Sequence, residues 1–270
     1  MSASSLAKET GRTAFGLNPA SYDRSRPDYP DWVFETLHSH CGVNQGTAAF
    51  EIGAGTGKAT RQLLTLGVNP LLAIEPDPRL ATFLEGGTVQ PALRVVNSAF
   101  EDVELGSSSF DLGTSATAFH WLDEDAALAK IARALRGGGW WAPFWNIYGN
   151  PSKPDPFHEA TLDLLSSGPT NPSNDGHSRL EFGADVDARV SAINATGAFD
   201  SIDWHRSTWS VVLDAAQTVE LYASYSNVSL RPDREAVLAE LERIAREDFD
   251  NQVTRNITTM LYMARRSASG

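Results

Sequence analysis

One run near the start of the chain restricts the fold more than any other: Ala48 to Thr60, which reads AAFEIGAGTGKAT. The apolar residues before Gly53 are typical of a buried strand, and Lys58 to Leu66 follows a helical pattern. Three glycines at alternate positions join the two. Glycine permits a sharp turn and lets a ligand lie against the backbone, where the first N–H groups of the helix point at it. The run therefore predicts a strand–turn–helix ligand site.

An acidic residue strengthens this prediction. Leu71 to Ile74 reads as a second buried strand, and Glu75 stands at its carboxyl end. In a doubly wound sheet the ends of the first two strands lie side by side, and an acid there can accept both hydroxyls of a ribose. The glycine loop and Glu75 together predict a site for an adenosine-containing ligand.

The spacing of the glycines separates two classes of such ligand. Dinucleotide sites carry G-x-G-x-x-G, whereas this chain has Gly53, Gly55 and Gly57, with Glu51 two residues earlier. A carboxylate so close would repel a pyrophosphate, but it suits a ligand that carries an ammonium and a sulfonium group. This favours a sulfonium cofactor. A nicotinamide dinucleotide, and an ordinary corner with no ligand, stay open as alternatives.

The alternation of strand and helix patterns from residue 48 to residue 147 predicts a parallel sheet covered by helices. The expected fold class is α/β, a doubly wound, mostly parallel sheet of seven strands with helical cap insertions. The further strands are expected at 93–98, 110–115, 140–147, 202–212 and 256–264, the last two antiparallel, and helices at 123–136, 215–226 and 231–248. Pro143 lacks a backbone donor inside a central strand, which predicts a bulge there.

The chain is expected to divide into three kinds of segment. Residues 1–31 form an N-terminal segment that covers the cofactor. The core comprises 32–149, 183–212 and 252–265, and the cap insertions over the acceptor site comprise 150–182, rich in proline and glycine, and 213–251.

Composition excludes several classes of function. The 270 residues carry a net charge of −12 with no basic block, which argues against nucleic acid or an anionic membrane as partner. The single cysteine, Cys41, excludes an internal disulfide and an all-cysteine metal site, and no other metal-ligand spacing is present. Neither a signal peptide nor a membrane-spanning run is evident, so the expected location is the cytoplasm.

Two groups of motifs carry a resemblance to a known family. The pattern E-x-G-x-G-T-G-K, the acid Glu75, the strand at 110–112 and the strand after residue 138 resemble class I S-adenosylmethionine-dependent methyltransferases. The segments Tyr22 to Pro30 and Ala118 to Asp123 are similar to a small-molecule branch that includes trans-aconitate methyltransferase-like proteins, which methylate a carboxylate. The match runs from about residue 22 to residue 146.

The resemblance implies a Rossmann-like methyltransferase fold, S-adenosyl-L-methionine as the cofactor, and transfer of its methyl group to an oxygen or nitrogen of a small-molecule acceptor by direct in-line displacement. A protein that binds the cofactor without transferring the methyl group stays the main alternative. A base is needed only where the acceptor carries a proton, and a carboxylate acceptor would need none.

The resemblance also implies the site residues. Those for the cofactor are Tyr22, Arg26, Glu51, Gly53, Ala54, Gly55, Glu75, Pro76, Ala99, Phe100 and Ser115. Glu51 is expected to face the ammonium group, and Glu75 the ribose. Tyr22 and Arg26 either cover the cofactor and bind a carboxylate, of the cofactor or the acceptor, or simply anchor the N-terminal segment.

One histidine and several aromatic residues are candidates for the acceptor side. His120, just past the fourth predicted strand, is the candidate catalytic base, although a structural role, with a ring nitrogen bonded to a loop carbonyl, is the commoner fate of such a histidine. Trp121 is expected to pack. The candidates for an acceptor pocket are Trp145, Phe157, His158, Trp204, Trp209, Tyr222 and Tyr225.

Overall fold

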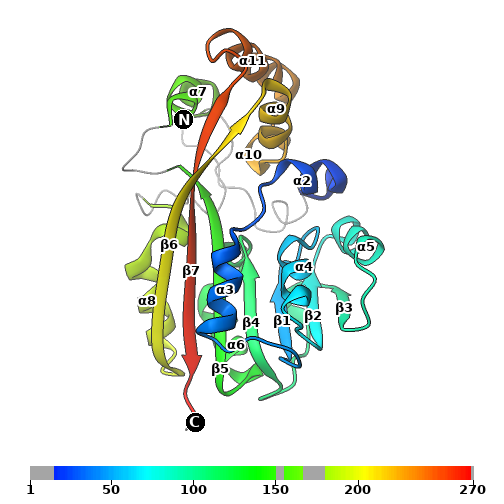
Figure 1. Ribbon diagram of the computed structural model, residues 1–270, viewed down its shortest axis with the longest axis vertical. Coiled ribbons are helices and arrows are strands. Elements are labelled where there is room, and N and C mark those ends of the chain that lie inside the picture. Colours follow the sequence, from blue (N-terminus) through cyan, green and yellow to red (C-terminus); the bar gives the residue numbers. More distant parts are fainter. Residues whose placement is uncertain (1–14, 150–154, 167–179, 269–270) are drawn as a thin grey trace.

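A seven-stranded sheet with the order β3-β2-β1-β4-β5-β7-β6 runs through the computed structural model, which describes residues 15–149, 155–166 and 180–268 (Figure 1). The strands are β1 (Ala49–Ile52), β2 (Leu71–Glu75), β3 (Leu93–Asn97), β4 (Phe110–Ala116), β5 (Leu135–Tyr148), β6 (Phe199–Leu213) and β7 (Val253–Arg266). β1 to β5 pair in parallel, and β7 is antiparallel to both β5 and β6. The predicted fold class is therefore confirmed.

Helices cover both faces of this sheet because side chains alternate along the strands. On one face, α3 (Asp31–Ser39) and α4 (Lys58–Thr65) pack Leu37 and Leu63 into a cluster with Phe144. On the other face, α6 (Glu124–Ala134) and α8 (Val186–Ala195) pack against residues such as Phe50 of β1. The helix α5 (Pro78–Gly87) follows β2 and buries Leu84 against the start of the glycine loop.

A second, helical layer lies at one end of the sheet. Its helices are α7 (Pro156–Ser166), α9 (Ala215–Ala223), α10 (Ser226–Ser229) and α11 (Arg234–Glu247), here called the cap. The long ribbon of β6 and β7 extends beyond the other strands and carries the cap at its tip (Figure 1). Phe157, Tyr222, Val237 and Leu241 form a hydrophobic cluster of the cap's own. The cap therefore lies over the end of the sheet and is attached to it by the β6–β7 ribbon.

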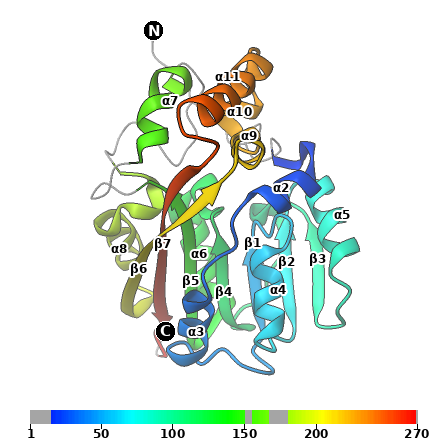
Figure 2. The same cartoon turned by 45° about the horizontal axis from the view of Figure 1, so that its top comes forward.

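A short N-terminal helix, α2 (Pro19–Ser25), lies between the cap and the sheet layer (Figure 2). It contacts α9 of the cap and α5 of the core. Asn18 caps its start by accepting the N–H of Ser21, and a proline occupies its first position. From the sequence, residues 1–31 are expected to cover the cofactor, but no helix is predicted within them. Short η (3-10) helices complete the described chain: η1 (Phe15–Leu17), η2 (Phe100–Asp102), η3 (Phe119–Trp121) and η5 (Phe182–Ala184).

Some expected boundaries differ from those observed. The helix expected at 215–226 ends at Ala223, and the separate helix α10 follows it. The bulge expected at Pro143 is wrong: Pro143 pairs with Ser115 in unbroken register, and the irregularity lies between Phe110 and Leu112. Opposite this point β5 contains consecutive glycines, of which Gly138 has a φ of +83°, so the extra residues are accommodated where the backbone is least restricted.

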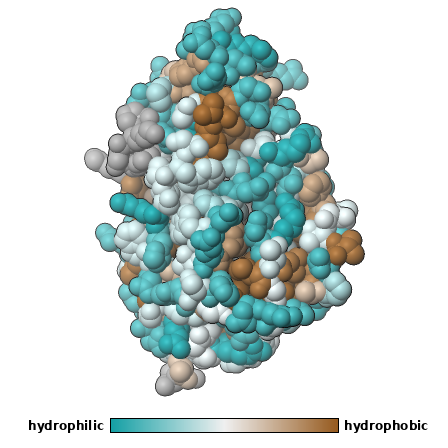
Figure 3. Space-filling model, in the orientation of Figure 1, coloured by the Kyte–Doolittle hydropathy of each residue, from teal (hydrophilic) through white to brown (hydrophobic). Residues whose placement is uncertain are grey.

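Parts of the expected segments lie outside the described residues, namely 1–14, 150–154 and 167–179. Within the described ranges, no helix is long and apolar enough to cross a membrane, and no group of three or more metal-binding side chains comes together. On the face shown in Figure 3, hydrophobic residues form separate spots among hydrophilic ones.

Candidate active site

The turn between β1 and α4 presents bare backbone to an open space. Gly53 and Gly55 have φ values of +69° and +58°, which L side chains rarely adopt. A Cβ atom on Gly53 would lie 2.4 Å from the Cβ of Ala118, so no side chain fits there. A Cβ on Gly55 would meet no described atom within 4 Å. The space above Gly55 is therefore available to a ligand that lies against the main chain.

Glu75 stands at the carboxyl end of β2 and holds this loop. Its Oε2 accepts the N–H of Gly55 and its Oε1 accepts the N–H of Asp77, both at 2.8 Å. Burial raises the pKa of the Glu75 carboxyl to about 7. The residue therefore fixes the shape of the glycine loop, a structural task that the sequence did not indicate, in addition to lining the space where a ribose is expected.

Glu51 in β1 is completely buried, and only one of its two carboxylate oxygens has a hydrogen-bond partner among the described residues. Its Oε2 accepts a hydrogen bond of 2.6 Å from the Thr60 hydroxyl, while its Oε1 has no hydrogen-bond partner in the described part of the chain. Burial, reinforced by the nearby charge of Glu75, raises the pKa of the Glu51 carboxyl to about 8. An unpaired buried carboxylate oxygen is costly, and a cationic group of a ligand would supply the missing partner.

Two adjoining cavities lie between the carboxyl ends of the strands and the cap. The larger, of about 420 Å³, reaches from Glu75 and Phe100 to Tyr222 and Arg255. The smaller, of about 60 Å³, is lined by Glu51, Ala54 and Lys58 among others. Both share Tyr22, Arg26, Gly53, Gly55, Ala116, Thr117, Asn146 and Tyr148. The larger volume falls within the range of about 300–1,000 Å³ typical of small-molecule sites.

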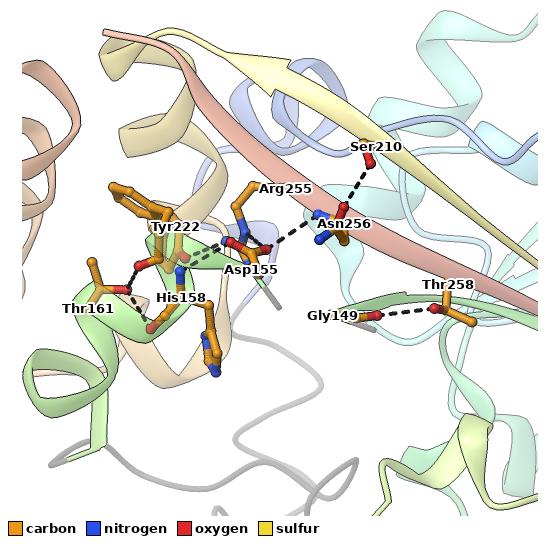
Figure 4. A network of polar contacts seen from close by, with 10 residues as sticks. Gly149, Asp155, His158, Thr161, Ser210, Tyr222, Arg255, Asn256 and Thr258 are labelled. Atoms are coloured by element: carbon orange, nitrogen blue, oxygen red, sulfur yellow. Dashed lines mark hydrogen bonds and ion pairs between the residues drawn. The ribbon is translucent and has the colours of Figure 1, made fainter. Parts of the chain in front are cut away.

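A buried ion pair ties the cap to the sheet on the far side of the larger cavity (Figure 4). The Nε of Arg255 in β7 donates to Oδ2 of Asp155 at 2.7 Å, and the two side chains are 3% and 4% exposed. Arg255 also donates to the hydroxyl of Tyr222 on α9, and Asp155 accepts the N–H of His158 at the start of α7. The charge of Arg255 is thus neutralised within the protein.

The second arginine of the cavities, Arg26, has no such counter-charge. It donates to the hydroxyl and the carbonyl oxygen of Ser224 at 2.8 and 3.0 Å, and its guanidinium lies 4.5 Å from the centroid of the Tyr225 ring. In the described residues no carboxylate pairs with it. Arg26 therefore anchors the N-terminal segment to the cap, and it also brings an uncompensated positive charge to both cavities.

His120 follows β4 and lines the larger cavity, and the residue as a whole is 7% exposed. Its Nδ1 lies 3.3 Å from the indole Nε1 of Trp145. An indole N–H can only donate, so Nδ1 accepts and a neutral His120 carries its proton on Nε2. In this tautomer Nε2 donates a hydrogen bond and cannot take a proton. The contact with Trp145 therefore disfavours the general-base role predicted for His120.

Comparison with known proteins identifies the class of this site. Residues 50–142 match a family model described as a methyltransferase domain. Along 93% of its length the chain is 28% identical to an uncharacterized methyltransferase of Schizosaccharomyces pombe, and it covers 96% of that protein. The chain is an S-adenosylmethionine-dependent methyltransferase.

Solved structures agree with this methyltransferase at the level of the fold. A putative type II methyltransferase from Anaeromyxobacter dehalogenans superposes with a TM-score of 0.61 at 21% identity, covering 89% of this chain and 97% of that one. A Haemonchus contortus phosphoethanolamine N-methyltransferase, solved with S-adenosylhomocysteine, gives a TM-score of 0.56 at 13% identity, with 93% and 57% covered.

The residues of the smaller cavity fit the cofactor of a methyltransferase. S-adenosylmethionine carries an ammonium group, a carboxylate and a sulfonium. Glu51 offers a buried carboxylate oxygen without a partner, Arg26 offers a cation without a counter-charge, and the space above Gly55 admits a ligand. All three observations concern atoms that the described chain leaves unsatisfied or open at this one place.

The structure brings most of the predicted cofactor residues together. Those that line one or both cavities are Tyr22, Arg26, Glu51, Gly53, Ala54, Gly55, Glu75, Pro76, Ala99 and Phe100. Ser115 does not reach either cavity. Its side chain is fully buried and donates to the carbonyl oxygen of Ile52 at 2.9 Å, so it joins β4 to β1.

The predicted acceptor aromatics separate into two sets. His158, Tyr222 and Tyr225 line the larger cavity, as does Trp121. The others lie elsewhere: Trp145 bonds to His120, Phe157 is in the cluster of the cap, Trp204 is 41% exposed on β6, and Trp209 donates to Thr259.

Other cavity residues were missed from the sequence. Asn146 and Tyr148 end β5, so the rule that ligands bind at the carboxyl ends of parallel strands would have found them. Arg255 and Glu181 also line the larger cavity. No local pattern marks either residue, because their places depend on how the cap and η5 fold back over the sheet.

Proposed function

We propose that this methyltransferase transfers a methyl group to an oxygen or nitrogen of a small molecule held between the strand ends and the cap. The observation that carries the proposal is the sharing of Gly53 and Gly55 by two cavities. The smaller one, beside Glu51, suits the amino-acid end of the cofactor. The larger one extends past the glycine loop to Tyr222 and Arg255, which leaves room for an acceptor.

Most of the predicted cofactor residues have a place in this proposal. Glu51 binds the ammonium group, Arg26 the carboxylate and Glu75 the ribose hydroxyls, while Pro76, Ala99 and Phe100 surround the adenine. The main chain of Gly53 to Gly55 runs along the methionine part. When bound, the cofactor supplies a methyl group already activated on sulfonium.

The chain has to place the acceptor in line with that methyl group and keep water out. Orientation of this kind supplies about 7–11 kcal/mol of a barrier. The cap, carried on the β6–β7 ribbon and joined to α2 through Arg26 and Ser224, encloses the acceptor end. We propose the division into a covering N-terminal segment, a core and a cap on this basis.

The finer resemblance to trans-aconitate methyltransferase-like proteins would make the acceptor a carboxylate, which is one of the oxygen acceptors that this proposal includes. The cytoplasmic location and the absence of a nucleic-acid partner also stay predictions, supported by the net charge of −12 and the lack of a basic block.

Label transfer tests the proposed function. The protein is incubated with S-adenosylmethionine tritiated in the methyl group and a deproteinised small-molecule extract of the source organism. We expect label in extract components of low molecular mass, in amounts that depend on the protein. Binding of S-adenosylhomocysteine without any transfer of label would instead favour a cofactor-binding protein that does not methylate.

A further inference from the structure

The larger cavity contains an acid that the cofactor roles leave unused. Glu181 lines this cavity immediately before η5, and its carbonyl oxygen accepts the N–H groups of Ala184 and Asp185. Its carboxylate makes neither a hydrogen bond nor an ion pair with any residue that the structure describes. Glu181 is therefore a partly buried acid that lines the cavity without a side-chain partner among the described residues.

The segment that carries Glu181 is held firmly against the site. The ring of Phe182 lies 6.2 Å from that of His120 and 5.9 Å from that of Trp145. A Cβ on Gly183 would lie 2.7 Å from the indole of Trp145, and the carbonyl oxygen of Gly183 accepts the hydroxyl of Tyr262. Glu181 thus directly precedes a residue that packs against His120, and both Glu181 and His120 line the larger cavity.

Several of the other ionisable groups of the cavity are already engaged within the protein. Among the arginines, Arg255 is neutralised by Asp155, and Arg26 is engaged by Ser224. Both oxygens of Glu75 accept main-chain N–H groups.

The lining of the larger cavity also includes Glu101, His120, His158 and several tyrosines. The Nδ1 of His120 already accepts a hydrogen bond from Trp145, and burial raises the pKa of Tyr148, Tyr222 and Tyr225 above that of an ordinary phenol. Burial without a compensating partner also raises the pKa of Glu181, to about 7. A base works best with a pKa near the working pH.

We propose that Glu181 accepts the proton of the acceptor, and that the acceptor is therefore a hydroxyl or an amine rather than a carboxylate. The inference rests on the proposed function and deepens it. The lone pair of the acceptor oxygen or nitrogen forms the bond to the methyl carbon, and the carbon–sulfur bond breaks with its electron pair left on sulfur. The O–H or N–H proton passes to the carboxylate of Glu181, which later releases it to water.

A carboxylate acceptor is poorly suited to the part of the cavity that Glu181 lines. It has no proton to give up, and the like charge of Glu181 would repel it at any pH where both are ionised. A hydroxyl or an ammonium group, in contrast, supplies the hydrogen-bond donor that the Glu181 carboxylate lacks.

The chemical class of the labelled product tests the acceptor. Extract components labelled as above are treated with mild alkali. Methyl esters release volatile labelled methanol, whereas methyl ethers and methylamines keep their label. We expect the label to stay with the product, and release as methanol would overturn the inference. If no label is transferred although S-adenosylhomocysteine binds, the proposed function itself fails.

The substitution Glu181→Gln tests the residue, because glutamine has nearly the same shape and cannot accept the proton. We expect the rate of label transfer to fall about 10²-fold or more, with unchanged affinity for S-adenosylhomocysteine. The matched control is Glu159→Gln on the exposed face of α7, which should leave the rate unchanged. The wild-type rate should fall as pH drops through about 7, and this limb should be absent in the residual activity of the variant.

The pH dependence of the unfolding midpoint provides a further test that does not require catalytic turnover. Because the pKa of Glu181 is raised in the folded state, its contribution to stability is full below about 4.5 and is lost as pH rises through about 7. The unfolding midpoint of Glu181→Gln relative to wild type should therefore rise between pH 5 and pH 8. An unchanged rate and pH profile in Glu181→Gln, or an equal loss of cofactor affinity, would overturn the role of Glu181.

Discussion

At the scale of single residues, the site is defined by charges that the protein itself leaves without partners. Glu51 has one buried oxygen unsatisfied, and Arg26 has no carboxylate beside it among the described residues. A folded chain gains nothing from such groups, since an unpaired buried polar atom costs about 1–3 kcal/mol. Their place at one end of a cavity supports the proposal that they bind a ligand with the opposite charges.

Glu51→Gln should separate stability from binding. Burial raises the pKa of the folded Glu51 carboxyl to about 8 from its ordinary value of 4.5, so its stabilising contribution is full below about 4.5 and is lost as pH rises through about 8. Without ligand, the variant should gain stability relative to wild type between pH 5 and pH 8. Its affinity for S-adenosylhomocysteine should nevertheless fall about tenfold or more, because a charge-assisted hydrogen bond is lost.

Thermal unfolding at several pH values and calorimetry of the complex measure both effects. A constant difference in midpoint across the pH range would show that Glu51 does not titrate in this window. Unchanged affinity would remove Glu51 from the ammonium site.

Arg26→Lys distinguishes the two tasks of Arg26. Lysine cannot reproduce the planar pairing of guanidinium with a carboxylate. We expect the affinity for S-adenosylhomocysteine to fall about tenfold or more, whereas 5′-methylthioadenosine, which lacks the amino-acid part, should bind as it does to wild type. An equal loss for both ligands would mean that Arg26 acts only as an anchor to the cap. Arg24→Lys, at an exposed pair with Glu220, is the control and should change neither affinity.

At the scale of elements, the site is assembled where helical segments fold back over the strand ends. Two ion pairs, Asp23 with Arg61 and Asp28 with Lys58, hold the α2 region to α4, while Arg26 holds it to α9. The cap is joined to β7 by the buried pair of Asp155 and Arg255. The enclosure of the acceptor end thus depends on a few specific contacts between segments distant in sequence.

Asp155→Asn should weaken the cap strongly. It would leave the buried guanidinium of Arg255 without its counter-charge, and removing one partner of a buried pair typically costs about 3–5 kcal/mol. Asparagine preserves the size of the side chain, so the loss would report the charge. Denaturant unfolding measures the change. Glu240→Gln, at an exposed pair with Arg243 in the same cap, should leave the midpoint unchanged, and equal effects of the two substitutions would contradict the role of the buried pair.

Local sequence patterns predicted the elements of the sheet better than those of the cap. The strands and helices around the glycine loop follow from apolar periodicity that only the local chain determines. The break between α9 and α10 was missed, because the apolar residues continue across Ser224 and Tyr225 and mask it. The role of Ser224 as the anchor of Arg26 depends on contacts nearly two hundred residues apart.

The candidate site shows the same limit. Glu51, Gly55 and Glu75 could be predicted because strand ends and turns place them together whatever the rest of the chain does. His120 was placed correctly beside the cavity, but its tautomer depends on Trp145, which lies on another strand. Glu181 and Arg255 reach the cavity only through tertiary packing, so no reading of their neighbours in sequence would have selected them.

At the scale of the whole molecule, the sheet layer and the layer formed by the cap and α2 contribute different residues to the proposed site. The sheet layer contributes the glycine loop, Glu51 and Glu75, which are fixed by strand ends and main-chain hydrogen bonds. The cap and α2 contribute Arg26, Tyr222 and Tyr225 on the opposite side. A ligand that fills both cavities would touch both layers, so binding should stabilise the contacts between them.

The measurement that tests this account most directly is calorimetric binding of S-adenosylhomocysteine to wild type, Gly55→Val and Gly42→Val. Both glycines have positive φ values, +58° and +71°, and a Cβ on either meets nothing within 4 Å, so the two substitutions impose a similar backbone strain. Only Gly55 faces the cavities. We predict binding by wild type and Gly42→Val and no measurable binding by Gly55→Val, with all three proteins folded. Normal binding by Gly55→Val would contradict the account, because the cofactor would then lie elsewhere.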